Sequence, residues 1–92
     1  MLSNIVFSVA RKPQAIVSRV EEKSALQGHL IISLQVESEL LCALKCLNTL
    51  NCFSFNYKMN REICELNHTN KLTSPHDFVW DVDTVYYEMA FN

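Results

Sequence analysis

Residues 38–66 read S-E-L-L-C-A-L-K-C-L-N-T-L-N-C-F-S-F-N-Y-K-M-N-R-E-I-C-E-L, and this stretch contains all four cysteines of the 92-residue chain. The cysteines follow the spacing C-x3-C-x5-C-x11-C, at Cys42, Cys46, Cys52 and Cys64. An even number of cysteines in so short a chain is typical of a secreted domain braced by disulfides, because a short chain buries little surface on folding. We therefore expect two disulfide bonds.

The first half of this stretch predicts a helix that begins at Ser38. The Ser38 side chain can accept a hydrogen bond from an unpaired amide of the first turn, and Glu39 is favoured at the positive end of the helix dipole. Apolar residues then recur at steps of three and four, which indicates one apolar stripe facing a core. The residues of this predicted stripe are Leu40, Ala43, Leu44, Leu47 and Leu50.

The helix limits how the cysteines can pair. Cys42 and Cys46 lie one turn apart on the same helix face, so a bond between these two has poor geometry. Two pairings remain. We favour the nested one, Cys42 with Cys64 and Cys46 with Cys52, because it only requires the end of the helix to fold back onto the following strand.

Strand patterns flank the helix. Residues 30–36 (L-I-I-S-L-Q-V) are rich in branched side chains, and residues 53–58 alternate aromatic and polar side chains, as a half-buried strand does. Weaker patterns predict the remaining elements: an edge strand over 15–20, a hairpin turn at 59–62, a strand over 63–66, a polar loop over 67–77, and strands over 78–80 and 85–89.

The charge composition changes near Lys23. Residues 1–23 carry four basic and two acidic side chains, whereas residues 24–92 carry four basic and eight acidic ones, a net charge of −4. We assign residues 1–23 to a leader or flanking segment and residues 24–92 to the domain. No basic cluster could neutralise a phosphate backbone, and no apolar run approaches the roughly 20 residues that span a bilayer, so we expect neither nucleic-acid binding nor membrane insertion.

The run S-E-L-L-C-A-L-K-C-L-N-T-L-N-C-F-S-F-N-Y over residues 38–57, followed by C-E-L at 64–66, resembles the PAN/apple domain. The chain lacks the two further cysteines that join the ends of full apple domains, so it is similar to the four-cysteine subgroup. The resemblance implies an α+β fold, with one helix packed on a small antiparallel sheet and the nested disulfide pairing. It also implies a protein- or carbohydrate-binding role outside the cell, with no catalytic activity and no cofactor.

The sequence offers little support for catalysis or for a metal site. No nucleophile stands beside a recognisable base, and the three histidines fall in predicted turns or loops. Cys46, Cys52, Cys64 and His68 are the conceivable zinc ligands. Their spacing lacks the close cysteine pairs of common structural zinc sites, so we expect no metal.

Three residues are candidates for glycosylation or ligand contact. Asn67 begins the N-x-[ST] sequon N-H-T, in the predicted loop where a glycan would project into solvent. Lys58 and Arg61, near the predicted hairpin turn, are the best exposed cations for ligand contact, although such cations more often only solvate a turn. Trp80, the single tryptophan, is expected in the core.

These patterns favour a non-catalytic extracellular recognition or adhesion module, one unit of a larger secreted or surface protein. The alternative is a free-standing secreted ligand or inhibitor, and a third hypothesis is an intracellular zinc-binding domain. Because the basic residues after Lys23 are scattered among acidic ones, we expect the partner to be an extracellular protein or a neutral glycan and not a polyanion.

Overall fold

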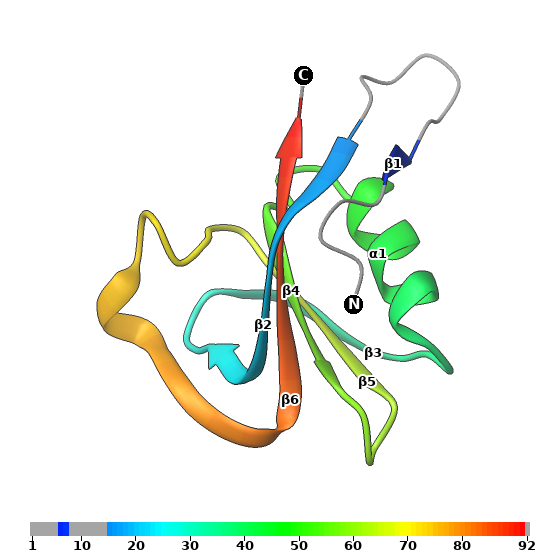
Figure 1. The fold of residues 1–92 in the computed structure, drawn as a ribbon. Helices are drawn as coiled ribbons and strands as arrows, with labels where there is room; N and C mark the ends of the chain where they lie inside the picture. The colour runs from blue at the N-terminus through cyan, green and yellow to red at the C-terminus, as the bar shows by residue number, and fades with distance from the viewer. Residues whose placement is uncertain (1–5, 8–14, 92) are drawn as a thin grey trace.

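One helix and a six-stranded antiparallel sheet form the described part of the chain, which comprises residues 6–7 and 15–91 of the computed structural model (Figure 1). The strand order is β1-β2-β6-β4-β5-β3. The predicted α+β fold, one helix on an antiparallel sheet, is confirmed. The elements are β1 (Val6–Phe7), β2 (Ala15–Leu26), β3 (Leu30–Gln35), α1 (Glu39–Leu47), β4 (Ser54–Lys58), β5 (Ile63–Asn67), the 3-10 helix η1 (Pro75–Asp77) and β6 (Phe78–Phe91).

The helix begins where the sequence predicts and ends earlier. Ser38 is the N-cap, because its side chain accepts a hydrogen bond from the Leu41 N–H at 3.2 Å. The helix ends at Leu47, and Leu50 is 85 % exposed beyond it. The predicted apolar stripe is therefore only partly correct. The buried face of α1 consists of Cys42, Ala43, Cys46 and Leu47.

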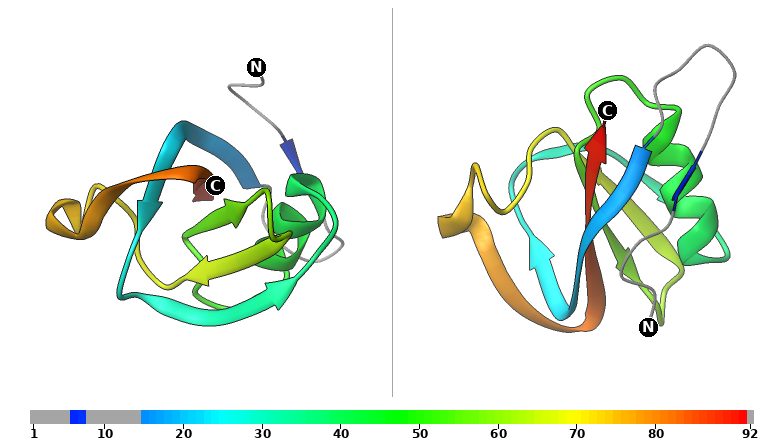
Figure 2. Two further views of the ribbon diagram at one scale, coloured as in Figure 1. Left: turned by 90° about the horizontal axis from the view of Figure 1, so that it is seen from below. Right: turned by 45° about the horizontal axis from the view of Figure 1, so that its top comes forward.

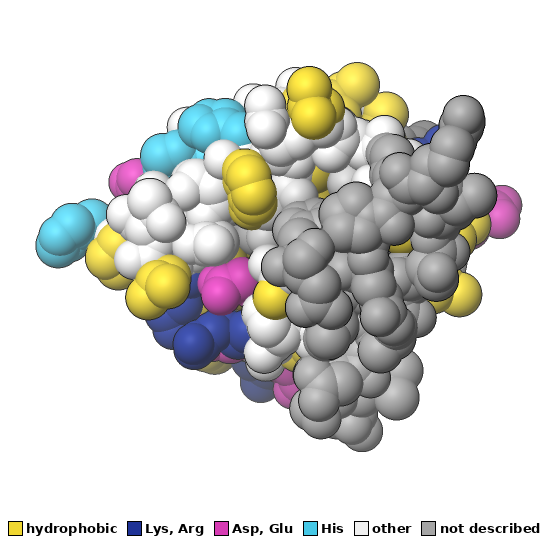
Figure 3. All heavy atoms as spheres, turned by 90° about the horizontal axis from the view of Figure 1, so that it is seen from above, with side chains coloured by type: hydrophobic (Ala, Val, Ile, Leu, Met, Phe, Trp, Pro, Cys, Tyr) yellow, Lys and Arg dark blue, Asp and Glu magenta, His cyan; other side chains and the backbone are white. Residues whose placement is uncertain are grey.

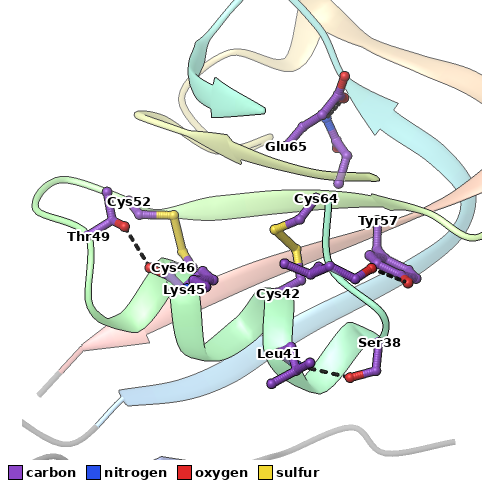
Figure 4. The surroundings of a disulfide bond; sticks show 12 residues. Ser38, Leu41, Cys42, Lys45, Cys46, Thr49, Cys52, Tyr57, Cys64 and Glu65 are labelled. Carbon is purple, nitrogen blue, oxygen red and sulfur yellow. Dashed lines mark hydrogen bonds between the residues drawn. A yellow bond between two sulfur atoms is a disulfide. The ribbon is translucent and has the colours of Figure 1, made fainter. Parts of the chain in front are cut away.

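The disulfides explain why the buried face of α1 differs from the predicted apolar stripe. Cys42 bonds to Cys64 on β5, and Cys46 bonds to Cys52 just before β4, so both bonds tie the same face of α1 to the sheet (Figure 4). The nested pairing is thus the one present. Because the cysteines occupy the face nearest the sheet, Leu40 is turned away from it and is exposed.

The main core lies between α1 and the sheet. Phe55 on β4 is fully buried and stacks on Tyr87 of β6, with ring centroids 4.7 Å apart. The Tyr57 hydroxyl donates a hydrogen bond to the Val36 carbonyl at 3.0 Å, and the Tyr87 hydroxyl donates to the Glu39 carboxylate. Burial raises the pKa of Tyr87 above its ordinary value, so its hydroxyl stays protonated as a donor.

The opposite face of the sheet is also covered, and it is polar. β4 is buried on both faces, which corrects the prediction of a half-buried strand. Two segments lie over this second face. The end of β2 is held there by the Asn56 amide, which binds the Leu26 backbone. The segment after β5 is held by the Ser54 hydroxyl, which donates to the Thr69 carbonyl at 2.6 Å. Every buried side-chain nitrogen or oxygen of the described residues has a hydrogen-bond partner. The buried polar residues are Ser54, Asn56, Asn67, Thr84 and Glu88.

Strands β2 and β6 are longer than their sequence patterns indicate. β2 begins at Ala15 and lies between β1 and β6, so residues 15–20 do not form an edge strand. The expected boundary between residues 23 and 24 falls inside β2. β6 is one strand where two were expected, and it bulges where four residues, 81–84, lie opposite the single Lys23, whose φ is 55°.

Candidate functional site

A pocket of about 190 Å³ lies on the polar side of the sheet. One wall is the end of β2 and the turn that follows it, residues 25–28, with Leu30 at the start of β3. Strands β4 and β5 supply the other side through Lys58, Glu65 and Asn67. In Figure 4, Glu65 points away from the helix while the neighbouring Cys64 points toward it. The pocket is thus on the side of the sheet that α1 leaves free.

Two local features hold the pocket wall in place. Gly28 has a φ of 83°, a left-handed conformation that glycine adopts without steric cost, and it allows the chain to reverse between β2 and β3. The side chain of Asn56 then fixes the end of β2, accepting from the Leu26 N–H at 2.9 Å and donating to the Leu26 carbonyl at 2.8 Å. A fully buried amide therefore clamps the wall to β4.

The cation of the pocket is already paired. The Lys58 Nζ lies 3.0 Å from the Asp81 carboxylate and 3.9 Å from that of Glu65, and its side chain is only 15 % exposed. Glu65 also accepts a hydrogen bond from the Asn56 side chain at 3.1 Å. The expectation that Lys58 is freely exposed is wrong, although Lys58 does line the pocket.

Arg61 lies elsewhere. It is exposed in the turn between β4 and β5, which spans residues 59–62 as the sequence predicts, and it does not line the pocket. The structure therefore does not combine Lys58 and Arg61 into one cationic site. Contact of either residue with a ligand stays a prediction.

The Lys58–Asp81 pair leads to a pH-dependent prediction. The hydrogen bond from Lys58 lowers the pKa of Asp81 below 3.8, so the ionised carboxylate is favoured in the folded state. The stabilising contribution of this carboxylate is fully present above the pKa that Asp81 has in the unfolded chain. It is lost as the pH falls through the lower pKa that Asp81 has in the folded domain. We expect Asp81→Asn to lower the free energy of unfolding by about 1 kcal/mol at pH 7 and by less near pH 2.

Urea denaturation at the two pH values measures this difference. Asp83→Asn is the matched control, because Asp83 is exposed on the same bulge and its carboxylate makes no ion pair with any described residue. An equal loss for Asp81→Asn at both pH values would contradict the assignment.

Asn67 is not in a loop. It is the last residue of β5, is 1 % exposed, and its Nδ2 donates a hydrogen bond to the Ser54 hydroxyl at 3.2 Å. Nδ2 is the atom to which an N-linked glycan is attached. The expectation that Asn67 lies in a solvent-exposed loop is therefore wrong, and its glycosylation stays a prediction.

Sequence reasoning missed two surface features near the pocket wall. His29 lies 2.7 Å from the Asp77 carboxylate and packs edge-on against His68, with ring centroids 5.3 Å apart. Figure 3 shows two histidine side chains together on the surface with an acidic side chain beside them. Trp80 is 73 % exposed, so its expected place in the core is wrong, and the Lys23 Nζ lies 5.9 Å from its ring.

The described residues offer no metal centre and no membrane span. All four cysteine sulfurs are in disulfides, so the zinc hypothesis has no thiolates to use. Between residues 15 and 91, no group of three or more His, Cys, Asp or Glu is placed to hold a metal ion. No described helix has the length and apolar character that crossing a membrane requires.

Fold and pocket together define a small disulfide-braced domain, with one helix bonded to an antiparallel sheet and a polar pocket on the far side. The family profile of the PAN domain matches residues 17–91, and the chain belongs to this family. PAN domains are protein- or carbohydrate-binding modules of extracellular proteins and are generally non-catalytic. A comparison with curated proteins finds no match.

Proposed function

We propose that this PAN domain is a non-catalytic recognition module of an extracellular protein, and that it binds an uncharged polar segment of a protein or a neutral glycan in the pocket. The observation that carries the proposal is the pairing of Lys58 with both Asp81 and Glu65. One cation facing two carboxylates leaves no excess positive charge to attract a polyanion. The amide and carboxylate oxygens around it can still hydrogen-bond hydroxyl and amide groups.

A non-catalytic role fits the chemistry of the pocket. A nucleophile must have a base within hydrogen-bond reach, and the base needs an orienting partner. The pocket-lining residues are amides, aliphatic side chains, one lysine and one glutamate. The lysine is already paired with Asp81 and Glu65, and the glutamate also accepts a hydrogen bond from Asn56. We therefore assign the pocket to binding.

The compartment and the larger protein belong to the same proposal. Two disulfides are typical of extracellular proteins, and they support secretion. We propose that the domain is one unit of a longer secreted or surface protein, with a free-standing secreted ligand or inhibitor as the alternative. The precursor distinguishes them: further domains encoded beside this one support the first, and a signal peptide with this domain alone supports the second.

The experiment is a binding screen of the oxidised domain against neutral glycans, extracellular protein domains and heparin, repeated with Gln27→Trp. Gln27 is exposed at the pocket rim, so a tryptophan there fills the pocket and leaves the buried Asn56 clamp intact. We expect one class of neutral ligand to bind, and Gln27→Trp to weaken that binding at least tenfold, about 1.4 kcal/mol.

Asn60→Trp, in the exposed turn between β4 and β5, adds the same side chain away from the pocket and serves as the control. Salt-sensitive retention on heparin as the strongest signal would overturn the neutral-ligand proposal. Equal binding by wild type and Gln27→Trp would place the binding site elsewhere on the domain.

A further inference from the structure

The open edge of the sheet is β3. Among the described residues, β3 is the last strand in the order and pairs only with β5. The Val36 N–H donates to the Glu62 carbonyl at 2.9 Å, so the backbone groups of Val36 and of Leu34, two residues earlier, are directed toward β5. The N–H and C=O groups of Ser33 and Gln35 therefore face away from β5. A further strand would need these donors and acceptors.

This edge lacks the usual protection against strand addition. Proteins normally protect a sheet edge with charged side chains, proline or a bulge. β3 has an irregularity between Leu30 and Ile32, but its pairing with β5 is regular from Ile32 to Gln35, and that segment contains neither a charge nor a proline. Ile32 is 44 % exposed, although it is a large branched apolar residue.

The two faces of β3 differ in character. Ile32 pairs with Leu66 and Leu34 pairs with Cys64, and both partners belong to the core beneath α1. Directly paired residues of antiparallel strands point to the same face, so Ile32 and Leu34 point to the helix side. Ser33 pairs with Glu65 and points to the pocket side. A strand that adds here should offer apolar residues on one face and uncharged polar residues on the other.

We propose that this edge is a dimer interface, at which a second copy of the chain adds its own β3 in antiparallel orientation. A two-fold axis at Leu34 places Leu34 opposite Leu34 of the second copy and Ile32 opposite Val36. On the other face it places Ser33 opposite Gln35 of the second copy, and the outward backbone groups of these two residues then pair. Over residues 32–36, each apolar residue meets an apolar residue and each polar residue meets a polar one. Such an isologous contact closes after two copies.

The charges around the edge agree with self-association. No charged residue lies between Leu30 and Val36, so antiparallel pairing of two β3 strands opposes no like charges. The nearest charge is Glu37. With the two-fold axis at Leu34, it lies opposite the apolar Ile31 of the second copy and far from the other Glu37.

The helices leave room for this arrangement. α1 is bonded to β5 through Cys42–Cys64, so the two helices of a dimer are held apart by the strands between them. Three strand spacings separate the two β5 strands, roughly 14 Å. Packed helices need only about 8 to 10 Å between axes. Both helices can therefore lie on one face of the continuous sheet without a clash.

The contact is small, so we expect a weak dimer that is visible at high protein concentration. Sedimentation velocity of the oxidised domain should show a dimer population that grows between about 10 µM and 1 mM. Ile32→Lys should weaken dimerisation at least tenfold, because it places a charge on the apolar face in both copies. Ser33→Pro should do the same, because it removes an outward N–H that the pairing with β5 does not use.

Leu72→Lys is the control, because Leu72 is exposed in the segment after β5 and away from β3. Circular dichroism and urea denaturation show whether each variant folds. In the wild type, amide hydrogen exchange at Ser33 and Gln35 should slow as the concentration rises, while exchange at Leu34 stays unchanged. A monomer at all concentrations would overturn the proposal, and so would a dimer that persists in Ile32→Lys or unchanged exchange at Ser33 and Gln35.

Discussion

Replacing Cys42 and Cys64 together with alanine is expected to lower the free energy of unfolding by about 3 to 4 kcal/mol. The Cys42–Cys64 bond closes a loop with a sequence separation of 22 residues, and loop closure of this length restricts the unfolded chain by roughly 3.4 kcal/mol. The bond is also fully buried between α1 and β5, so its loss removes packing from the core. The total free energy of unfolding of a small domain is only about 5 to 15 kcal/mol.

Urea denaturation of the double variant measures this loss, with the Cys46→Ala, Cys52→Ala variant as the comparison. The Cys46–Cys52 bond spans a sequence separation of 6 residues, for which the same relation gives roughly 2.2 kcal/mol. We expect loss of the Cys42–Cys64 bond to lower the free energy of unfolding more than loss of the Cys46–Cys52 bond. The reverse order, or two equal losses, would show that loop closure does not set the contribution of these bonds.

Asn56→Leu is expected to lower the free energy of unfolding by roughly 3 kcal/mol, because it leaves buried polar groups without partners. The Asn56 side chain satisfies both the N–H and the carbonyl of Leu26, and it also donates to Glu65. Leucine has a similar size but no hydrogen-bonding group. The end of β2 should then separate from β4, and the wall of the pocket with it.

Chemical denaturation gives the loss of stability, and amide exchange at Leu26 reports the release of the wall. Asn60→Leu is the matched control, since Asn60 is exposed in a turn and a surface substitution there should change stability by no more than about 0.5 kcal/mol. Unchanged exchange at Leu26 in Asn56→Leu would contradict the role of Asn56 as the clamp.

Sequence reasoning succeeded where the controlling interactions are local. The Ser38 cap bonds an amide three residues away, and the turn at 59–62 joins two neighbouring strands. The position of two cysteines on one helix face excludes a bond between these two, and the short return from the helix to the next strand favours the nested pairing that is present. Patterns over a few residues carry this kind of information, and the family resemblance added the arrangement of the helix on the sheet.

The errors arose where distant segments meet. Lys58 looks free in sequence, but its partner Asp81 is 23 residues away, across β4 and β6. His29 and Asp77 are 48 residues apart. Asn67 and the polar face of β4 are buried by the end of β2 and the segment after β5. No sequence pattern within β4 or β5 indicates this burial. The long-range hydrogen bonds that close the pocket leave no periodic signal in the sequence.

The pairing of Ala15 with Phe91 affects how the domain would respond to mechanical tension. The start of β2 and the end of β6 lie side by side, at the same end of the sheet (Figure 2). A pull on the two ends would act across these strands, so it would separate their hydrogen bonds one pair after another and not shear them all at once. The force would bypass α1 and both disulfides, which join β5 and the segment before β4 to the helix. Under load β2 and β6 would separate first, and the bonded part from Cys42 to Cys64 would stay together.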